Sequence, residues 1–220
     1  MKTNEKRIFF AGCLLVILFV IWTWLVQTID VQSVGVNGTN IGFATFNCWF
    51  HKLTGVHMTL YTITDWLGLI PLFVCIMFGG LGVVQLIKRR SLLKVDLDVT
   101  FLGIYYVIVI IGYLIFEMFP VNYRPILIQG VMEASYPSST TLLVLGVIPT
   151  LREQTNRRVE NVVVKRSVSV LAMCFSVFMV MGRLISGVHW FTDIVGAIIL
   201  SEGMFLIYKA SILSICEEER

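Results

Sequence analysis

Charged side chains are scarce in this sequence. Asp, Glu, Lys and Arg together make up 14% of its 220 residues, whereas 57% are hydrophobic and the mean hydropathy is +0.84. A soluble domain of this size has no need of so much apolar surface, so the composition predicts an integral membrane protein. The net charge of +3 gives no sign of nucleic-acid binding, and no nucleic-acid partner is expected.

Disulfide and metal-binding patterns are also missing. Cys13, Cys75 and Cys174 fall inside apolar runs, and Cys48 and Cys216 lie far apart in the chain, so no disulfide framework is implied. No set of metal ligands is visible at a recognisable spacing. We therefore expect neither a structural metal nor a cofactor.

Six stretches have the apolar character that a bilayer demands of a spanning helix, about 20 residues each. The first lacks a small-residue cleavage site and is too long for a signal-peptide core, so we expect it to be retained. The fourth is short, and we expect its first turn to be buried in protein. The sequence thus predicts an all-α protein, a single domain over residues 1–220 built as a six-transmembrane-helix bundle. The predicted spans are 8–28, 61–87, 99–119, 138–151, 168–186 and 191–209.

Lysine and arginine in the connections predict the orientation, because cytoplasmic loops carry an excess of both. Basic residues crowd the amino terminus and the connections after the second and fourth spans, and few stand opposite them. Both termini are therefore expected in the cytoplasm of a cell-membrane protein, with the loops that hold Arg124, Ser138 and His189 on the external face. The basic residues on the expected cytoplasmic side are Lys2, Lys6, Arg7, Lys88, Arg89, Arg90, Lys94, Arg152, Arg157, Arg158, Lys165 and Arg166.

The longest connection, 30–61, is expected to be external. Its aromatic part, 41–53, has the character of a segment that lies along the membrane surface. His51 and His57 fall in this connection, and we interpret both as interfacial histidines without a catalytic role.

Polar residues of chemical interest gather in the segment 181–197. His189 and Asp193 are four apart, so they share a face of a helix, where the carboxylate could orient the imidazole. Arg183 precedes a Ser186-Gly187 break at which the chain can turn back toward the same point. Ionisable residues at membrane depth survive mainly where they line a polar cavity. An oriented imidazole beside an arginine is suited to attack on a phosphoryl group.

Two further external segments are expected to converge on this site. Arg124 follows the third span, and Ser138, Ser139 and Thr140 follow Pro137 at the start of the fourth. Pro followed by Ser and Thr is typical of a helix amino terminus, whose N–H groups can bind an anion. The expected site therefore holds a phosphate group with Arg124, Arg183 and the first turn of a helix.

With these residues in view, the sequence resembles the type 2 phosphatidic acid phosphatase superfamily, the integral membrane lipid phosphatases. The family has three motifs: Lys, six residues and Arg-Pro; Pro-Ser-Gly-His; and Ser-Arg, five residues, His, three residues and Asp. The resemblance is strongest over residues 117–197. The matching residues are Arg124-Pro125, Pro137-Ser138, Arg183, His189 and Asp193, and the third motif differs only at its leading Ser, where this chain has Gly182.

The resemblance implies a lipid phosphate substrate and a phosphohistidine intermediate. His189 would be the nucleophile and Asp193 its orienting partner, while Arg124, Arg183 and residues 138–140 would bind the phosphate oxygens. Two departures from the family pattern matter for the chemistry. The lysine of the first motif falls on Glu117, and the histidine of the second, which protonates the leaving group, falls on Thr140.

These departures leave two alternatives for Glu117 and two for the function. Glu117 could pair with Arg124 or Arg183, which we favour, or could be a protonated substitute acid. A lipid phosphatase without a histidine acid should prefer a diphosphate, polyprenyl diphosphate above all, because its leaving group is stable as an anion. The alternative is a lipid-phosphate-binding or scaffold protein that has lost turnover. Either would have membrane lipids as its partners.

Overall fold

The computed structural model describes residues 3–218 of the chain, and the side chains of residues 3–215. Within this range the elements are eight α-helices and two 3-10 helices, Val36–Gly38 and Leu92–Lys94, with no β-strand. The prediction of an all-α protein is confirmed. The α-helices are α1 Thr3–Thr28, α2 Ala44–Thr54, α3 Met58–Leu67, α4 Leu69–Arg89, α5 Leu97–Met118, α6 Ser139–Arg158, α7 Val162–Ile185 and α8 Phe191–Glu218.

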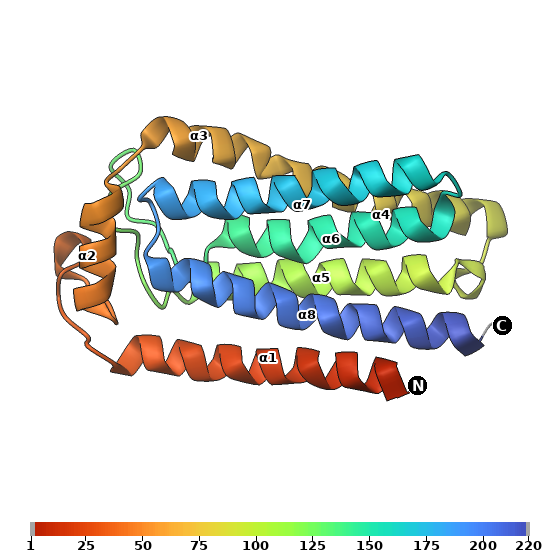
Figure 1. Ribbon diagram of the computed structural model, residues 1–220, viewed down its shortest axis with the longest axis horizontal. Coiled ribbons are helices and arrows are strands. Elements are labelled where there is room, and N and C mark those ends of the chain that lie inside the picture. The colour runs from red at the N-terminus through yellow and green to blue at the C-terminus, as the bar shows by residue number, and fades with distance from the viewer. Residues whose placement is uncertain (1–2, 219–220) are drawn as a thin grey trace.

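Five segments of the described chain are long and apolar enough to cross a membrane: α1, α3 with α4, α5, α7 and α8 up to Ile215. They run side by side in the bundle, with α6 among them (Figure 1). The protein is therefore a multi-pass membrane protein, whereas the count of six spans stays a prediction. It depends on α6, which has the length of a span but not the hydropathy.

The composition of α6 follows from its position in the middle of the bundle. It packs against α4, α5, α7 and α8, so protein rather than lipid surrounds it. Its polar groups find partners there: the Tyr105 hydroxyl donates to the Gly146 carbonyl at 2.7 Å, and the hydroxyls of Tyr106 and Thr150 lie 2.7 Å apart. These bonds satisfy polar atoms of the turns around Pro149, which itself cannot donate a backbone hydrogen bond. A helix in such surroundings needs fewer apolar residues than one facing lipid.

The outermost helix, α1, packs chiefly against α8 (Figure 1). Gly12 and Gly203 make the close approach possible. A Cβ atom at Gly12 would lie 2.9 Å from the Gly203 carbonyl oxygen, and one at Gly203 would lie 3.1 Å from the Gly12 oxygen. Small residues at a contact between membrane helices allow the backbones to pack at this distance.

The two ends of the bundle differ in character. α1 begins and α8 ends at one end, where the α4–α5 and α6–α7 connections also lie (Figure 1). At the other end α2 runs across the bundle, beside the connection between α5 and α6. The expected surface segment 41–53 thus contains a helix, Ala44–Thr54. Both termini and both basic connections share one end, as the charge pattern predicts, while the side of the membrane that this end faces stays a prediction.

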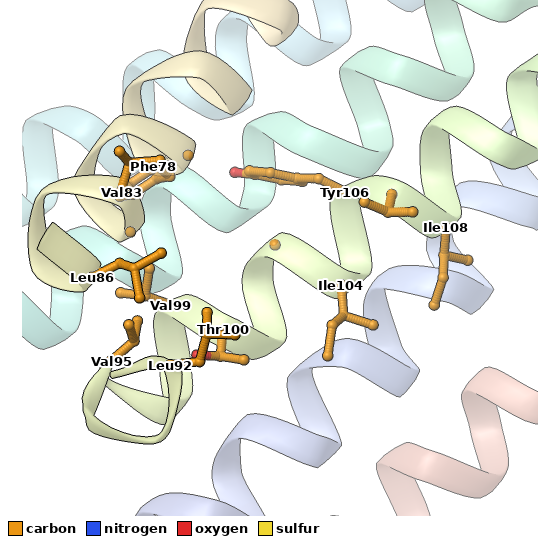
Figure 2. A pocket seen from close by; sticks show the side chains of 14 residues that line it. Phe78, Val83, Leu86, Leu92, Val95, Val99, Thr100, Ile104, Tyr106 and Ile108 are labelled. Atoms are coloured by element: carbon orange, nitrogen blue, oxygen red, sulfur yellow. The ribbon is translucent and has the colours of Figure 1, made fainter. Parts of the chain in front are cut away.

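An apolar groove of about 480 Å³ lies between the second half of α4 and the first half of α5. Figure 2 shows its lining, which includes Phe78, Leu86 and Ile104. Thr100 and Tyr106 contribute its few polar atoms. The groove is on the half of the bundle nearer the basic connections, so it is remote from the residues that the sequence singles out.

The orientation can be tested by labelling single cysteines from outside intact cells. In a variant without the five native cysteines, Val131→Cys should react with an impermeant maleimide, because Val131 is 59% exposed on the α5–α6 connection. Glu160→Cys, exposed between α6 and α7, should react only after the cells are opened. Reaction of Glu160→Cys alone in intact cells would reverse the predicted orientation.

Candidate active site

The end of the bundle that carries α2 brings together three segments distant in the chain. They are the α5–α6 connection, the turn between α7 and α8, and α3. Arg124, Arg183 and His189, which we call the arginine–histidine cluster, are 7%, 1% and 3% exposed there. The structure therefore brings together the three basic residues that the sequence singles out.

His189 is placed by the turn between α7 and α8. Helix α7 ends at Ile185, and Gly187 adopts a φ of +70°, where a Cβ atom would clash with the Gly55 carbonyl. His189 Nδ1 lies 3.1 Å from the carbonyl oxygen of Ser135, which can only accept a hydrogen bond. The proton is therefore assigned to Nδ1, leaving the lone pair of Nε2 free. Nε2 lies 3.5 Å from Nη2 of Arg183.

The charge state of His189 follows from its surroundings. Burial, together with the nearby charges of Arg124 and Arg183, holds the pKa of His189 well below its usual range. Both causes disfavour the imidazolium ion, so the imidazole stays neutral at physiological pH. A neutral imidazole with a free Nε2 lone pair is the form that can act as a nucleophile.

Asp193 is close to His189 but does not hydrogen-bond to it. Its Oδ2 atom is 3.8 Å from His189 Nδ1, too long for a hydrogen bond. Oδ2 instead accepts hydrogen bonds from the Ser135 hydroxyl at 2.7 Å and the Trp190 N–H at 2.9 Å, and Oδ1 receives the Asn122 amide at 3.4 Å. The sequence analysis expected a direct contact. The structure shows an indirect one, in which Asp193 fixes Ser135 and the Ser135 carbonyl fixes the imidazole.

The two arginines each have a carboxylate partner at the more exposed side of the cluster. Arg124 Nε lies 3.0 Å from Glu133 Oε2, and Arg183 Nη1 lies 3.5 Å from Asp65 Oδ1. Within the described residues, no hydrogen bond reaches Nη1 of Arg124 or Nε of Arg183, although both atoms are buried. Buried guanidinium donors rarely remain unpaired, and a bound oxyanion would satisfy them.

The first turn of α6 begins at Ser138, as the sequence predicts. The Ser138 N–H is not available to an anion, because it donates a hydrogen bond to the Asp193 carbonyl at 3.2 Å. The Ser138 hydroxyl donates to Thr141 Oγ1 at 3.0 Å. The helical ladder starts with Leu142, which donates to the Ser138 carbonyl at 2.9 Å. The N–H groups of Ser139 and Thr140 thus precede the ladder, and they are the ones suited to an anion.

Glu117 is exposed near the end of α5, where it borders a small pocket with Ser135 and Ser139. In the described part of the chain the arginines pair with Glu133 and Asp65, and no ion pair joins either to Glu117. The structure does not bring Glu117 to the arginines as the sequence analysis expected. Glu117 is in the last turn of α5, which ends at Met118, whereas Arg124 belongs to the connection that follows this helix.

Sequence reasoning missed the contribution of α3. Tyr61 and Asp65, one helical turn apart, both contact the cluster: the Tyr61 ring lies under both guanidinium groups, and Asp65 pairs with Arg183. A signal was present, because Asp65 is an ionisable residue inside a predicted span, 61–87. His51 also approaches the site, with its Nε2 3.0 Å from the Gly187 carbonyl, whereas the His57 ring lies against the Thr54 carbonyl of its own connection, with Nε2 2.8 Å from that oxygen.

Metal ligation was examined in the same region. Within the described residues, no group of three or more His, Cys, Asp and Glu side chains is arranged to hold a metal ion.

The fold shows the general class of this protein: it is a helical, multi-pass membrane protein with a buried basic cluster at one end of the bundle. The family follows from its sequence. The PAP2 superfamily matches residues 104–213, half of the chain, and the chain belongs to this superfamily.

A solved structure has a similar fold. It is the first transmembrane PAP2 type phosphatidylglycerolphosphate phosphatase from Bacillus subtilis, with a TM-score of 0.64 over 93% of this chain and 96% of the other. The two sequences are 15% identical, so this likeness is one of fold. No curated protein sequence matches the chain.

The protonation of His189 can be measured directly. The chain has three histidines, so ¹⁵N-histidine spectra can be assigned by comparison with His189→Gln. At pH 5.5 a histidine with an ordinary pKa near 6.5 would be about nine-tenths protonated. We expect His189 to remain neutral there, with the proton on Nδ1. Protonation of His189 near pH 6.5, or a proton on Nε2, would contradict the assignment.

Proposed function

We propose that this protein is a membrane lipid phosphatase that acts through a phosphohistidine on His189. The observation that carries the proposal is the position of His189 Nε2, unprotonated and 3.5 Å from the guanidinium group of Arg183. A protein that only binds phosphate has little use for a neutral imidazole aimed at the anion. Membership of the PAP2 superfamily supports the same conclusion.

Before the reaction, the phosphate group of the substrate would bind to three sets of donors: Arg183, Arg124 and the first turn of α6. Arg183 and Arg124 offer buried donors, Arg183 Nε and Arg124 Nη1, that have no hydrogen-bond partner in the described residues. The N–H groups of Ser139 and Thr140 add the positive end of the α6 dipole. These groups would hold the phosphoryl oxygens where negative charge accumulates in the transition state.

The reaction would then proceed in two displacements. His189 Nε2 donates its lone pair to the terminal phosphorus, the Nε2–P bond forms, and the bond from that phosphorus to the leaving oxygen breaks. The leaving group is the lipid monophosphate when the substrate is a diphosphate, and the lipid alcohol, which must gain a proton, when it is a monophosphate. The Ser135 carbonyl stabilises the imidazolium character that develops, because it accepts the Nδ1 proton throughout. Water next attacks phosphorus, the Nε2–P bond breaks, and inorganic phosphate leaves.

The identity of residue 140 bears on the substrate. Thr140 cannot protonate a leaving alkoxide as a histidine acid does, and such an acid contributes about 10²–10⁴ in rate. A phosphate monoester leaving from a diphosphate needs this proton less, since its second pKa is about 6. We therefore propose lipid diphosphates, with polyprenyl diphosphate favoured, over lipid monophosphates.

One observation favours the second candidate, a lipid-phosphate-binding protein without turnover. Glu133 and Asp65 compete with a phosphate for the two arginines, and Glu117 replaces the lysine that would have offset them. Such a protein would bind phosphate yet release none from any lipid. Phosphate release therefore separates the two candidates.

The first test is phosphate release by purified protein in detergent, on matched lipid monophosphates and diphosphates. Wild type should cleave the diphosphate faster, by about 10²–10⁴. His189→Gln should abolish both activities, while His57→Gln, on an exposed histidine outside the cluster, should change neither. Activity retained in His189→Gln, or equal rates on the two substrates, would refute the mechanism.

A second test restores the missing acid. Thr140→His should raise monophosphate hydrolysis more than diphosphate hydrolysis, because only the alkoxide needs the proton. Thr140 packs closely against Gly68, where a Cβ atom would lie 3.1 Å from Thr140 Cγ2, so correct folding of each variant has to be checked before its rates are compared. Thr140→Asn, similar in polarity but unable to act as an acid, is the matched control. An equal gain on both substrates would mean that residue 140 does not set the preference.

A further inference from the structure

Tyr61 of α3 lies against both arginines of the arginine–histidine cluster. The Cζ atom of Arg183 is 5.0 Å from the centroid of the Tyr61 ring, and that of Arg124 is 5.6 Å from it. The two arginines come from elements far apart in the chain, α7 and the α5–α6 connection. Tyr61 therefore joins the two guanidinium groups through a single side chain.

Two guanidinium groups close to one ring repel each other, and burial strengthens the repulsion because it removes the screening by water. An aromatic ring counters this, since the negative face of its π system attracts cations within about 6 Å. Both contacts at Tyr61 are within that distance. Because both guanidinium groups contact this one ring, neither can move away from it without losing a contact.

The carboxylates complete this arrangement from the exposed side. Asp65, one turn after Tyr61 on α3, pairs with Arg183 and has a 55% exposed side chain; Glu133, 36% exposed, pairs with Arg124. Exposed ion pairs contribute little, about 0–1 kcal/mol. The partly buried ring is thus better placed than either carboxylate to fix where the guanidinium groups lie.

Helix α3 is itself held firmly beside the cluster. Thr64 is fully buried, and a Cβ atom at Gly182 would lie 2.6 Å from Thr64 Cγ2, so only glycine at position 182 lets α3 pack this closely on α7. The His57 N–H at the start of α3 donates to the Ser186 carbonyl at 2.9 Å. Tyr61 is consequently presented by an element docked next to Arg183 and the turn that carries His189.

We propose that Tyr61 is a positioning residue for phosphate, which spaces and aims the guanidinium groups of Arg124 and Arg183 at an oxyanion facing His189. It acts through the arginines and through the face of its ring; its hydroxyl has no part. The inference rests on the proposed function only in taking the oxyanion to be a phosphate.

Calorimetric binding of inorganic phosphate to the purified full chain in detergent tests the proposal without requiring turnover. Tyr61→Leu, which keeps the bulk and loses the π system, should weaken phosphate binding about tenfold, as expected for the loss of two cation–π contacts. Tyr61→Phe keeps the ring and should bind within about twofold of wild type. In turnover assays KM should rise in Tyr61→Leu with a smaller change in kcat.

A fluorinated ring gives a second, shape-preserving test. Pentafluorophenylalanine incorporated at position 61 retains the packing of phenylalanine but withdraws the electron density that attracts cations. It should weaken phosphate binding as Tyr61→Leu does, and it decides the matter if Tyr61→Leu does not fold. Ile63→Ala, on a residue of α3 that is 46% exposed, is the control and should leave binding unchanged.

The outcomes separate this proposal from the enzymatic one. Unaltered phosphate binding in both Tyr61→Leu and the fluorinated variant would overturn the role of Tyr61, even if wild type hydrolyses lipids. A loss in Tyr61→Phe as large as in Tyr61→Leu would also overturn it, since the hydroxyl would then be the active group. Phosphate binding that depends on the ring, without any lipid hydrolysis, would support Tyr61 and refute the phosphatase.

Discussion

The buried carboxylate of Asp193 is the interaction on which the rest of this site depends. It accepts hydrogen bonds from Ser135, Trp190 and Asn122, and its own backbone carbonyl accepts one from the Ser138 N–H. Four points in two segments, the α5–α6 connection and the turn before α8, thereby bond to Asp193 in the first turn of α8. Hydrogen bonds to a charged group contribute about 1.5–3 kcal/mol each, more than neutral ones. These bonds help to hold the α5–α6 connection, whose described residues form no helix or strand, against the bundle.

This arrangement separates two tasks that a direct carboxylate–histidine contact would combine. Asp193 sets the position of the Ser135 backbone, and the Ser135 carbonyl, a neutral acceptor, sets the tautomer of His189. A neutral acceptor raises the affinity of the imidazole for a second proton, but less than a contacting carboxylate would, and here burial and the two arginines outweigh it. The low proton affinity of His189 and its fixed orientation therefore have different sources, burial beside two arginines for the first and Ser135 for the second.

Much of the fold could be predicted from the sequence, because apolar runs of membrane length leave few alternatives. The predicted spans fall on α1, α5, α7 and α8, although α7 begins at Val162, before the predicted 168, and α8 ends at Glu218, after the predicted 209. The predicted span 61–87 differs mainly in its division at Gly68. At the site, the approach of Arg124, Arg183 and His189 followed from motif spacing. Tyr61 was not foreseen, since an aromatic residue near the end of a membrane helix is ordinary. The Asp193–Ser135 relay could not be foreseen either. A four-residue spacing predicts a contact only when both residues are on one helix. His189 lies before α8 begins, and its side chain points toward Ser135 of the α5–α6 connection.

The polar character of α6 has a consequence for how the protein enters the membrane. A helix that is not apolar enough to be stable alone in lipid cannot follow the simple order in which spans insert first and associate later. Residues such as Thr150, Gln154 and the segment around Pro149 need partners supplied by Tyr106, Tyr208 and the surrounding helices. Insertion of α6 is therefore coupled to assembly of the bundle. The first turn of α6 is also part of the proposed anion site. That site would then form only in chains whose neighbouring helices have already assembled, so a defect in assembly would also abolish phosphate binding.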